Sequence, residues 1–175
     1  MKEMDLTKIK ALVFDIDGIF TDGGIYAIDN DLLRKYEAKD CFATRMAYMH
    51  GFKTGIITGG ISETIVQRMV RCGFNREDIY LGSRRKIEQF EDFCTRHGLS
   101  YDQVMYCGDD LPDIGVIKAA GFGACPADAV AEVKEAADYV SEYCGGRFFV
   151  RNTVEMIMKA QGKWNLDEEV YKQTF

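Results

Sequence analysis

The fold of this chain is decided near its start, by the run Ala11-Leu12-Val13-Phe14-Asp15-Ile16-Asp17-Gly18. Four apolar residues are followed by two carboxylates, one residue apart, and then by a glycine. The apolar run predicts a buried strand, so the carboxylates lie at the edge where that strand ends. Because residues i and i+2 of a strand share a face, Asp15 and Asp17 could meet one cation or one substrate. The alternative is an ordinary strand followed by a turn that aspartate and glycine favour.

Composition and charge restrict the class of protein. The 175 residues suit one globular domain, residues 1–175, and the 47% of hydrophobic residues can form a sizeable core. A net charge of −6 gives no support for nucleic-acid binding. No apolar run approaches the roughly 20 residues that a membrane-spanning helix needs, and the six widely spaced cysteines show no zinc-binding pattern. We therefore expect a cytoplasmic protein with reduced thiols, and neither nucleic acid nor membrane as a partner.

Strand-like and helix-like segments alternate along the chain, which predicts an α/β fold built on a parallel sheet. Strands are expected at residues 11–15, 52–57, 78–81, 104–107, 122–124 and 139–140. Helices are expected at residues 40–49, 62–72, 83–97, 113–120, 129–137 and 150–160, with Asp40, Ser62 and Ser83 at three of their starts.

One segment breaks this alternation. Residues 24–28 and 32–36 are β-prone and flank Asp29-Asn30-Asp31, which predicts a hairpin insertion at about residues 24–37. The hairpin has more apolar surface than a single exposed flap can bury, so it is a candidate contact between subunits. At the other end, residues 163–175 form an acidic, aromatic tail that could cover a neighbouring subunit's site or have no fixed structure.

The residues that carry chemistry lie where the predicted strands end, which is where ligands bind in a parallel sheet. These ends carry Asp15 and Asp17, Thr58, and Asp109, Asp110 and Asp113, and Lys86 opens the helix after another strand. A compact set of oxygen ligands with room for water suits Mg²⁺. Asp15, the backbone carbonyl of Asp17 and Asp109 form such a set.

Together these residues could transfer a phosphoryl group. Beside Mg²⁺, Asp15 is a competent nucleophile toward phosphorus, and Asp17 could exchange protons with the leaving group and with water. Thr58 could hold phosphate oxygens, and Lys86 could offset the charge of the transition state. Plainer roles stay open, because Thr58 could cap the strand end and Lys86 could belong to a solvated helix start. Asp110 is expected to shape its loop or to cap the helix that follows, rather than to bind metal.

Four short motifs that carry these residues, taken in chain order, resemble those of the haloacid dehalogenase superfamily of phosphatases. The resemblance rests on Asp15-Ile16-Asp17-Gly18, Thr58-Gly59, Lys86 and Gly108-Asp109-Asp110-Leu111-Pro112-Asp113. It implies a three-layer, Rossmann-like doubly wound parallel sheet, with Asp15 as nucleophile and Asp17 as acid and base. It also implies Mg²⁺ held by Asp15, Asp17 and Asp109, with Asp113 supporting the metal site or Lys86.

Residues 9–164 further resemble one group of that superfamily, the 3-deoxy-D-manno-octulosonate 8-phosphate phosphatases. The resemblance includes the hairpin and Ala127-Asp128-Ala129, Ala137-Asp138-Tyr139-Val140, Gly145-Gly146-Arg147 and Ala160-Gln161-Gly162-Lys163. It implies a domain without a cap, and a homotetramer in which a neighbouring subunit completes each active site. The implied activity is magnesium-dependent hydrolysis of 3-deoxy-D-manno-octulosonate 8-phosphate (KDO 8-phosphate) through an aspartyl-phosphate, in lipopolysaccharide precursor synthesis.

The resemblance assigns substrate binding to Asp17, Glu37, Ala38, Lys39, Asp40, Cys41, Arg45, Gly59, Gly60, Arg68 and Lys86. The chain departs from the group at Lys39-Asp40-Cys41-Phe42-Ala43, where a glycine-rich segment is usual, and at Gly60, where an arginine is common. A related group that acts on nine-carbon keto-deoxy sugar phosphates has glutamate at position 60, so that substrate remains an alternative. A catalytically silent regulatory subunit of a sugar-activating enzyme is another. Cys41 is a candidate reactive thiol.

Overall fold

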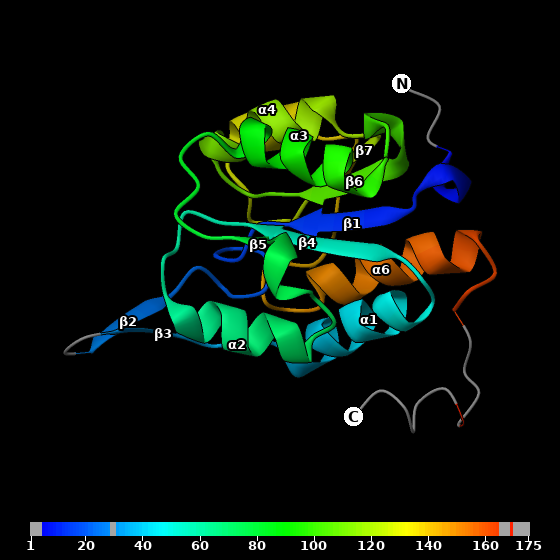
Figure 1. The fold of residues 1–175 in the computed structure, drawn as a ribbon. Helices are drawn as coiled ribbons and strands as arrows, with labels where there is room; N and C mark the ends of the chain where they lie inside the picture. Colours follow the sequence, from blue (N-terminus) through cyan, green and yellow to red (C-terminus); the bar gives the residue numbers. More distant parts are fainter. Residues whose placement is uncertain (1–4, 29–30, 165–168, 170–175) are drawn as a thin grey trace.

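The computed structural model describes residues 5–28, 31–164 and 169, and six parallel strands form its central sheet (Figure 1). The strands are β1 (Ala11–Phe14), β4 (Lys53–Ile57), β5 (Ile79–Tyr80), β6 (Val104–Cys107), β7 (Phe122–Cys125) and β8 (Tyr139–Val140). They lie in the order β5-β4-β1-β6-β7-β8. With the hairpin strands left out, this order is that of the Rossmann fold. The predicted doubly wound parallel sheet is confirmed.

Helices cover both faces of the sheet, so the molecule has three layers (Figure 1). One face carries α1 (Ala38–Met49), α2 (Glu63–Arg71) and α6 (Phe149–Ala160), and the other carries α3 (Lys86–His97), α4 (Ile114–Ala119) and α5 (Ala131–Ala136). Short 3-10 turns occur at η1 (Leu6–Lys8), η2 (Arg76–Asp78), η3 (Tyr101–Gln103) and η4 (Leu111–Asp113). Among the described residues, the helices are too short or too polar for any of them to span a bilayer.

The side chains of β1 alternate between two cores, one on each face of the sheet. Leu12 and Phe14 pack beneath α1, α2 and α6, while Ala11 and Val13 pack beneath α3, α4 and α5. All four are fully buried, and each larger side chain contributes roughly 1.5–3 kcal/mol when removed from water. β1 is therefore anchored on both faces and hydrogen-bonded on both edges, to β4 and β6. Asp15, the residue that follows β1, is therefore held in a fixed position.

Two predicted helix starts are wrong, because in both the predicted cap residue makes a different contact. α1 is capped by Glu37, whose side chain accepts the Lys39 N–H at 3.1 Å. The predicted cap, Asp40, lies within the helix and accepts the backbone N–H of Arg151 in α6 at 2.8 Å. α3 begins at Lys86, and the Ser83 hydroxyl donates at 2.6 Å to Gln89, within α3, instead of capping the helix. A tertiary contact thus takes the Asp40 side chain, and a contact with the helix itself takes that of Ser83.

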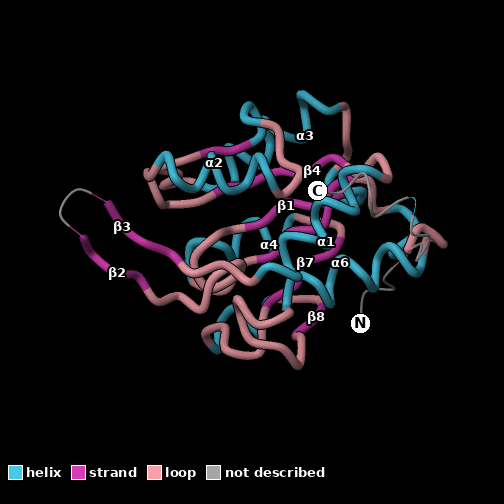
Figure 2. Tube along the Cα trace, turned by 90° about the horizontal axis from the view of Figure 1, so that it is seen from below, coloured by secondary structure: helices cyan, strands magenta, loops and turns pink. Residues whose placement is uncertain are grey.

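The hairpin is present and stands away from the sheet, on the side where β1 ends (Figures 1 and 2). Its strands β2 (Ile25–Ile28) and β3 (Asp31–Arg34) pair antiparallel, while residues 29 and 30 of the predicted turn lie outside the described residues. Five apolar side chains on the hairpin are 40–71% exposed: Ile25, Tyr26, Ile28, Leu32 and Leu33. Of the predicted tail, only residues 163, 164 and 169 are described.

Candidate active site

Asp15 lies directly after β1, at the central position of the sheet. Its backbone N–H extends the ladder by donating to the Cys107 carbonyl at 2.9 Å. One carboxylate oxygen accepts the Ile16 N–H at 2.7 Å, and the other forms an ion pair with the Lys86 Nζ at 2.7 Å. Asp15 is 8% exposed. These contacts orient the carboxylate while leaving it at the floor of a cavity.

Lys86, the first residue of α3, is held between two carboxylates. Its Nζ lies 2.7 Å from Asp15 Oδ2 and 2.7 Å from Asp113 Oδ1. Burial lowers the pKa of Lys86, but the charges of Asp15 and Asp113 outweigh that effect and raise it above the ordinary value. Lys86 is thus a fixed cation, as its predicted role requires. It is 5% exposed, which excludes the alternative of a solvated helix start.

Asp113 uses its oxygens to hold other groups in place. Besides Lys86, Oδ1 accepts the hydroxyl of Tyr106 at 2.6 Å, and Oδ2 accepts the backbone N–H groups of Asp109 and Asp110 at 3.2 and 3.3 Å. Tyr106 escaped the sequence analysis because an aromatic residue inside a buried strand resembles any core residue. Asp113 therefore positions both the lysine and the loop that carries Asp109.

Three carboxylates converge in a way that suits a metal ion. One oxygen each from Asp15, Asp109 and Asp113 lies within 4.8 Å of the others. Asp109 lies so close to Gly18 that a Cβ there would be 2.0 Å from its Oδ2, so only glycine fits. Burial, and then the charges of Asp15 and Asp113, raises the pKa of Asp109 to about 7. Burial also raises the pKa of Asp15 to about 6, against the opposing charge of Lys86. A divalent cation would offset this crowding of charge, so the residues fit Mg²⁺.

Asp17 also lines the cavity, but its carboxylate is paired with a residue that the sequence analysis missed. Arg34, at the end of β3, donates from Nε to Asp17 Oδ1 at 2.7 Å and from Nη2 to Oδ2 at 3.0 Å. The Arg34 side chain is 3% exposed and that of Asp17 is 29% exposed. The sequence feature that could have indicated this contact is glycine at position 60. A Cβ there would lie 3.2 Å from Arg34 Nη2 and would crowd the guanidinium.

The cavity brings together the catalytic and metal-site candidates. It has a volume of about 460 Å³ and its lining includes Asp15, Asp17, Thr58, Gly59, Gly60, Lys86, Asp109 and Asp113. Thr58, directly after β4, is 1% exposed, and its Oγ1 accepts the Gly60 N–H at 3.2 Å. Thr58 thus shapes the turn, as the plainer prediction had it, and at the same time lines the cavity. Arg84 lines it as well, without having been predicted.

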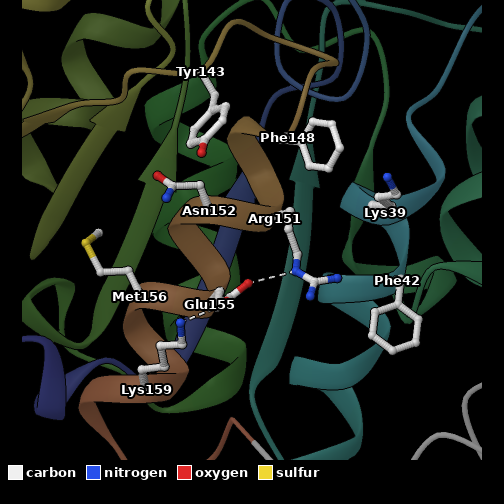
Figure 3. Close-up of a pocket in the computed structure, with 9 residues that line it drawn as sticks. All are labelled: Lys39, Phe42, Tyr143, Phe148, Arg151, Asn152, Glu155, Met156 and Lys159. Atoms are coloured by element: carbon white, nitrogen blue, oxygen red, sulfur yellow. Dashed lines mark hydrogen bonds and ion pairs between the residues drawn. The ribbon is translucent and has the colours of Figure 1, made fainter. Parts of the chain in front are cut away.

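The other predicted substrate residues line different cavities of the same chain. Lys39 lies in a groove of about 840 Å³ between α1 and α6, where its Nζ is 4.6 Å from the Phe148 ring centre (Figure 3). Ala38, Cys41, Arg45 and Arg68 line a third cavity of about 560 Å³. Glu37 caps α1 and Asp40 is fully buried. Within one chain, the described residues do not bring this group to Asp15.

Cys41, the predicted reactive thiol, is buried beside Cys72. A hydrogen bond from Cys72 and the charge of Arg68 lower the pKa of Cys41 below its ordinary value, although burial acts in the opposite direction. The side chain is 6% exposed. The thiol is therefore acidified but screened from solvent within the chain.

Comparison with known proteins agrees with the geometry. Residues 53–144 match the model of a family described as haloacid dehalogenase-like hydrolase. The chain is similar to the 3-deoxy-D-manno-octulosonate 8-phosphate phosphatase of Escherichia coli K12, with 33% identity over 161 residues, 91% of this chain and 84% of that protein. The predicted superfamily resemblance is confirmed.

Solved structures extend the likeness to the whole fold. The phosphatase of the same name from Yersinia pestis superposes with a TM-score of 0.87 at 29% identity, covering 90% of this chain and 85% of that one. The phosphatase of that name from Moraxella catarrhalis was solved with a magnesium ion, a phosphate ion and KDO. It superposes with a TM-score of 0.87 at 27% identity, covering 97% of this chain and 95% of that one.

Proposed function

The chain belongs to the haloacid dehalogenase-like hydrolases, and from that premise we propose that it is a magnesium-dependent phosphatase of KDO 8-phosphate. The observation that carries the proposal is the buried Asp15–Lys86–Asp113 arrangement, facing Asp109 in one cavity. Relatives named for this activity, at 33% identity, support the choice of substrate. The role in lipopolysaccharide precursor synthesis that the resemblance implies depends on this substrate.

In the proposed reaction, an Asp15 oxygen attacks the phosphorus atom and the bond from phosphorus to the sugar oxygen breaks. Asp17 gives its proton to the departing sugar oxygen. Lys86 and the backbone N–H groups beside Thr58 offset the negative charge that develops on the phosphoryl oxygens. In the second half, water attacks the phosphorus of the aspartyl-phosphate while Asp17 takes a proton from it, which releases phosphate and restores Asp15.

Asp15, Asp109 and the carbonyl of Asp17 are the groups proposed to hold Mg²⁺. Bound there, the ion supplies positive charge that brings the phosphate and the Asp15 carboxylate together. Asp113 is proposed to act indirectly, because its oxygens already accept from Lys86, Tyr106 and the loop backbone.

The proposed function is tested with a panel of sugar phosphates. We expect kcat/KM for the eight-carbon keto acid 8-phosphate to exceed that for nine-carbon keto acid 9-phosphates by about tenfold or more, and turnover to require added Mg²⁺ after treatment with EDTA. Preference for a nine-carbon compound would favour the alternative substrate. Folded protein without magnesium-dependent turnover would favour the silent regulatory subunit.

We further propose a homotetramer in which a second copy supplies the substrate residues that lie away from Asp15. Support comes from the exposed apolar hairpin, with Tyr26 71% exposed, and from the separate cavity that holds Arg45 and Arg68. Such a surface is unusual on a monomer. Tyr26→Glu is therefore expected to reduce the mass measured by light scattering from four subunits to two or one, whereas Lys53→Glu, on exposed β4 surface, should not. An unchanged tetramer in the Tyr26 variant would contradict the hairpin's role.

A cytoplasmic location is part of the same proposal. All six cysteines are free, five of them buried, as expected in a reducing compartment. Recovery of the native protein mainly from a compartment other than the cytoplasm would contradict it.

A further inference from the structure

We propose that Arg34 is a positioning residue, which sets the orientation of the Asp17 carboxyl group and so links the hairpin to the chemistry. The inference rests on the proposed function, because it concerns the group that exchanges protons with the sugar oxygen and with water. Arg34 itself reaches the cavity only through Asp17 and is not among the described residues that line it.

The first support is the form of the contact. Two parallel hydrogen bonds, Nε to Oδ1 at 2.7 Å and Nη2 to Oδ2 at 3.0 Å, join the planes of guanidinium and carboxylate. A paired contact of this kind fixes both the position and the rotation of the carboxylate, which a single hydrogen bond cannot do. Asp17, with its side chain 29% exposed, lines the cavity while both of its oxygens accept from Arg34.

The second support is where this arginine is buried. Its neighbours on β3, Leu32 and Leu33, are 40% and 51% exposed. The Arg34 side chain is 3% exposed, although arginine is rarely buried without a partner. Arg34 also donates from Nη1 to the Leu32 carbonyl at 3.4 Å, which holds the guanidinium against the hairpin's own backbone. The hairpin and Asp17 are thus joined through one side chain.

The third support is the space at Gly60. A Cβ at this position would lie 3.2 Å from Arg34 Nη2 and 2.8 Å from Ile65 Cδ1. Any side chain there would have to displace one of these neighbours. Glycine at this position therefore leaves room for the Arg34 guanidinium beside Asp17.

Loss of Arg34 is expected to slow the reaction only for substrates whose leaving group needs a proton from Asp17. A displacement of about 1 Å in a catalytic group can cost on the order of 100-fold in rate. That loss applies to a step that needs Asp17 as an acid, such as departure of a sugar alkoxide. It does not apply when the leaving group departs without a proton, as p-nitrophenolate does.

The test compares Arg34→Gln with wild type on two substrates, KDO 8-phosphate and p-nitrophenyl phosphate. Release of the alcohol is measured in the first turnover, before hydrolysis of the aspartyl-phosphate contributes. We expect about a 30- to 100-fold loss with the sugar phosphate and less than about threefold with p-nitrophenyl phosphate. Gly60→Ala, which crowds the guanidinium by a few tenths of an ångström, should give a smaller loss in the same direction, and Lys35→Gln, which removes a neighbouring exposed cation, should leave both rates unchanged.

A double-mutant cycle shows whether Arg34 acts through Asp17. With the sugar phosphate, Asp17→Asn combined with Arg34→Gln is expected to be as slow as Asp17→Asn alone. Additive losses, or an equal loss on both substrates in a variant with native circular dichroism, would overturn the inference while leaving the proposed function intact. If folded wild-type protein hydrolyses neither substrate, the proposed function fails and this inference fails with it.

Discussion

Replacing Asp15 with asparagine is expected to lower turnover by about 10⁴-fold or more, because loss of a nucleophile removes the covalent route altogether. Asparagine has nearly the same shape and can still accept the Ile16 N–H, which lies 2.7 Å from Asp15 Oδ1. Burial already raises the pKa of Asp15 to about 6, so the folded protein gains little from this charge near neutral pH. Lys86 loses one of its two partners but keeps Asp113 at 2.7 Å, so the free energy of unfolding should fall by less than for loss of Lys86, by about 1–2 kcal/mol.

The measurement is phosphate release at saturating substrate, together with urea unfolding of the same samples. Asp102→Asn, an identical change on the exposed turn η3, is the matched control and should retain wild-type turnover. Substantial activity in folded Asp15→Asn protein would exclude an aspartyl-phosphate on this residue.

Replacing Lys86 with methionine is expected to affect both stability and activity. The change leaves the carboxylates of Asp15 and Asp113 facing each other without the ammonium that lies 2.7 Å from each. Loss of one partner from a buried charge cluster typically costs about 3–5 kcal/mol. Turnover should fall by about 100-fold or more, because the transition state loses a fixed positive charge.

The stability loss should depend on pH. Asp15 has a pKa raised to about 6, so its protonated form favours folding, and that contribution is lost as the pH rises through 6. Without Lys86 the charged form is less favourable still, and more stability is lost between pH 5 and pH 8. Lys86 itself, with a raised pKa, remains charged throughout this range. The difference in the free energy of unfolding between variant and wild type is therefore expected to be smaller at pH 5 than at pH 8.

Urea unfolding at both pH values, in EDTA, measures this difference. Arg85→Gln is the neighbouring control, because its ion pair with Glu88 joins side chains that are 76% and 51% exposed. Such a pair contributes about 0–1 kcal/mol. An equal loss at pH 5 and pH 8 for Lys86→Met would show that packing of the side chain, rather than its charge, stabilises the site.

The sequence was sufficient to predict the floor of the site, and the reason is topological. Asp15, Asp109 and Lys86 follow parallel strands or open the next helix, and a parallel sheet gathers these positions at one edge. No further information was needed to bring them together.

Arg34 and Asp40 could not be predicted in the same way. Arg34 reaches Asp17 from the last residue of β3, where the hairpin rejoins the domain, and strand periodicity does not encode the direction in which a hairpin projects. Asp40 has the composition of a helix cap, but its partner is Arg151, 111 residues later in the chain. Four residues align by position with substrate contacts of the related phosphatases: Lys39, Cys41, Arg45 and Arg68. Within a single chain they line cavities other than the one that contains Asp15.

The central place of β1 has a consequence for how the protein is made. β1 pairs with β6, whose first residue, Val104, follows Phe14 by 90 positions (104 − 14). At about 5–20 residues per second, the ribosome needs on the order of 5–20 s to add that segment. During this interval β1, four apolar residues long, has an unpaired edge, which is a template for association with other chains. The strand that leads to Asp15, the proposed nucleophile, thus waits longer for its second partner strand than the position of β4 alone would require.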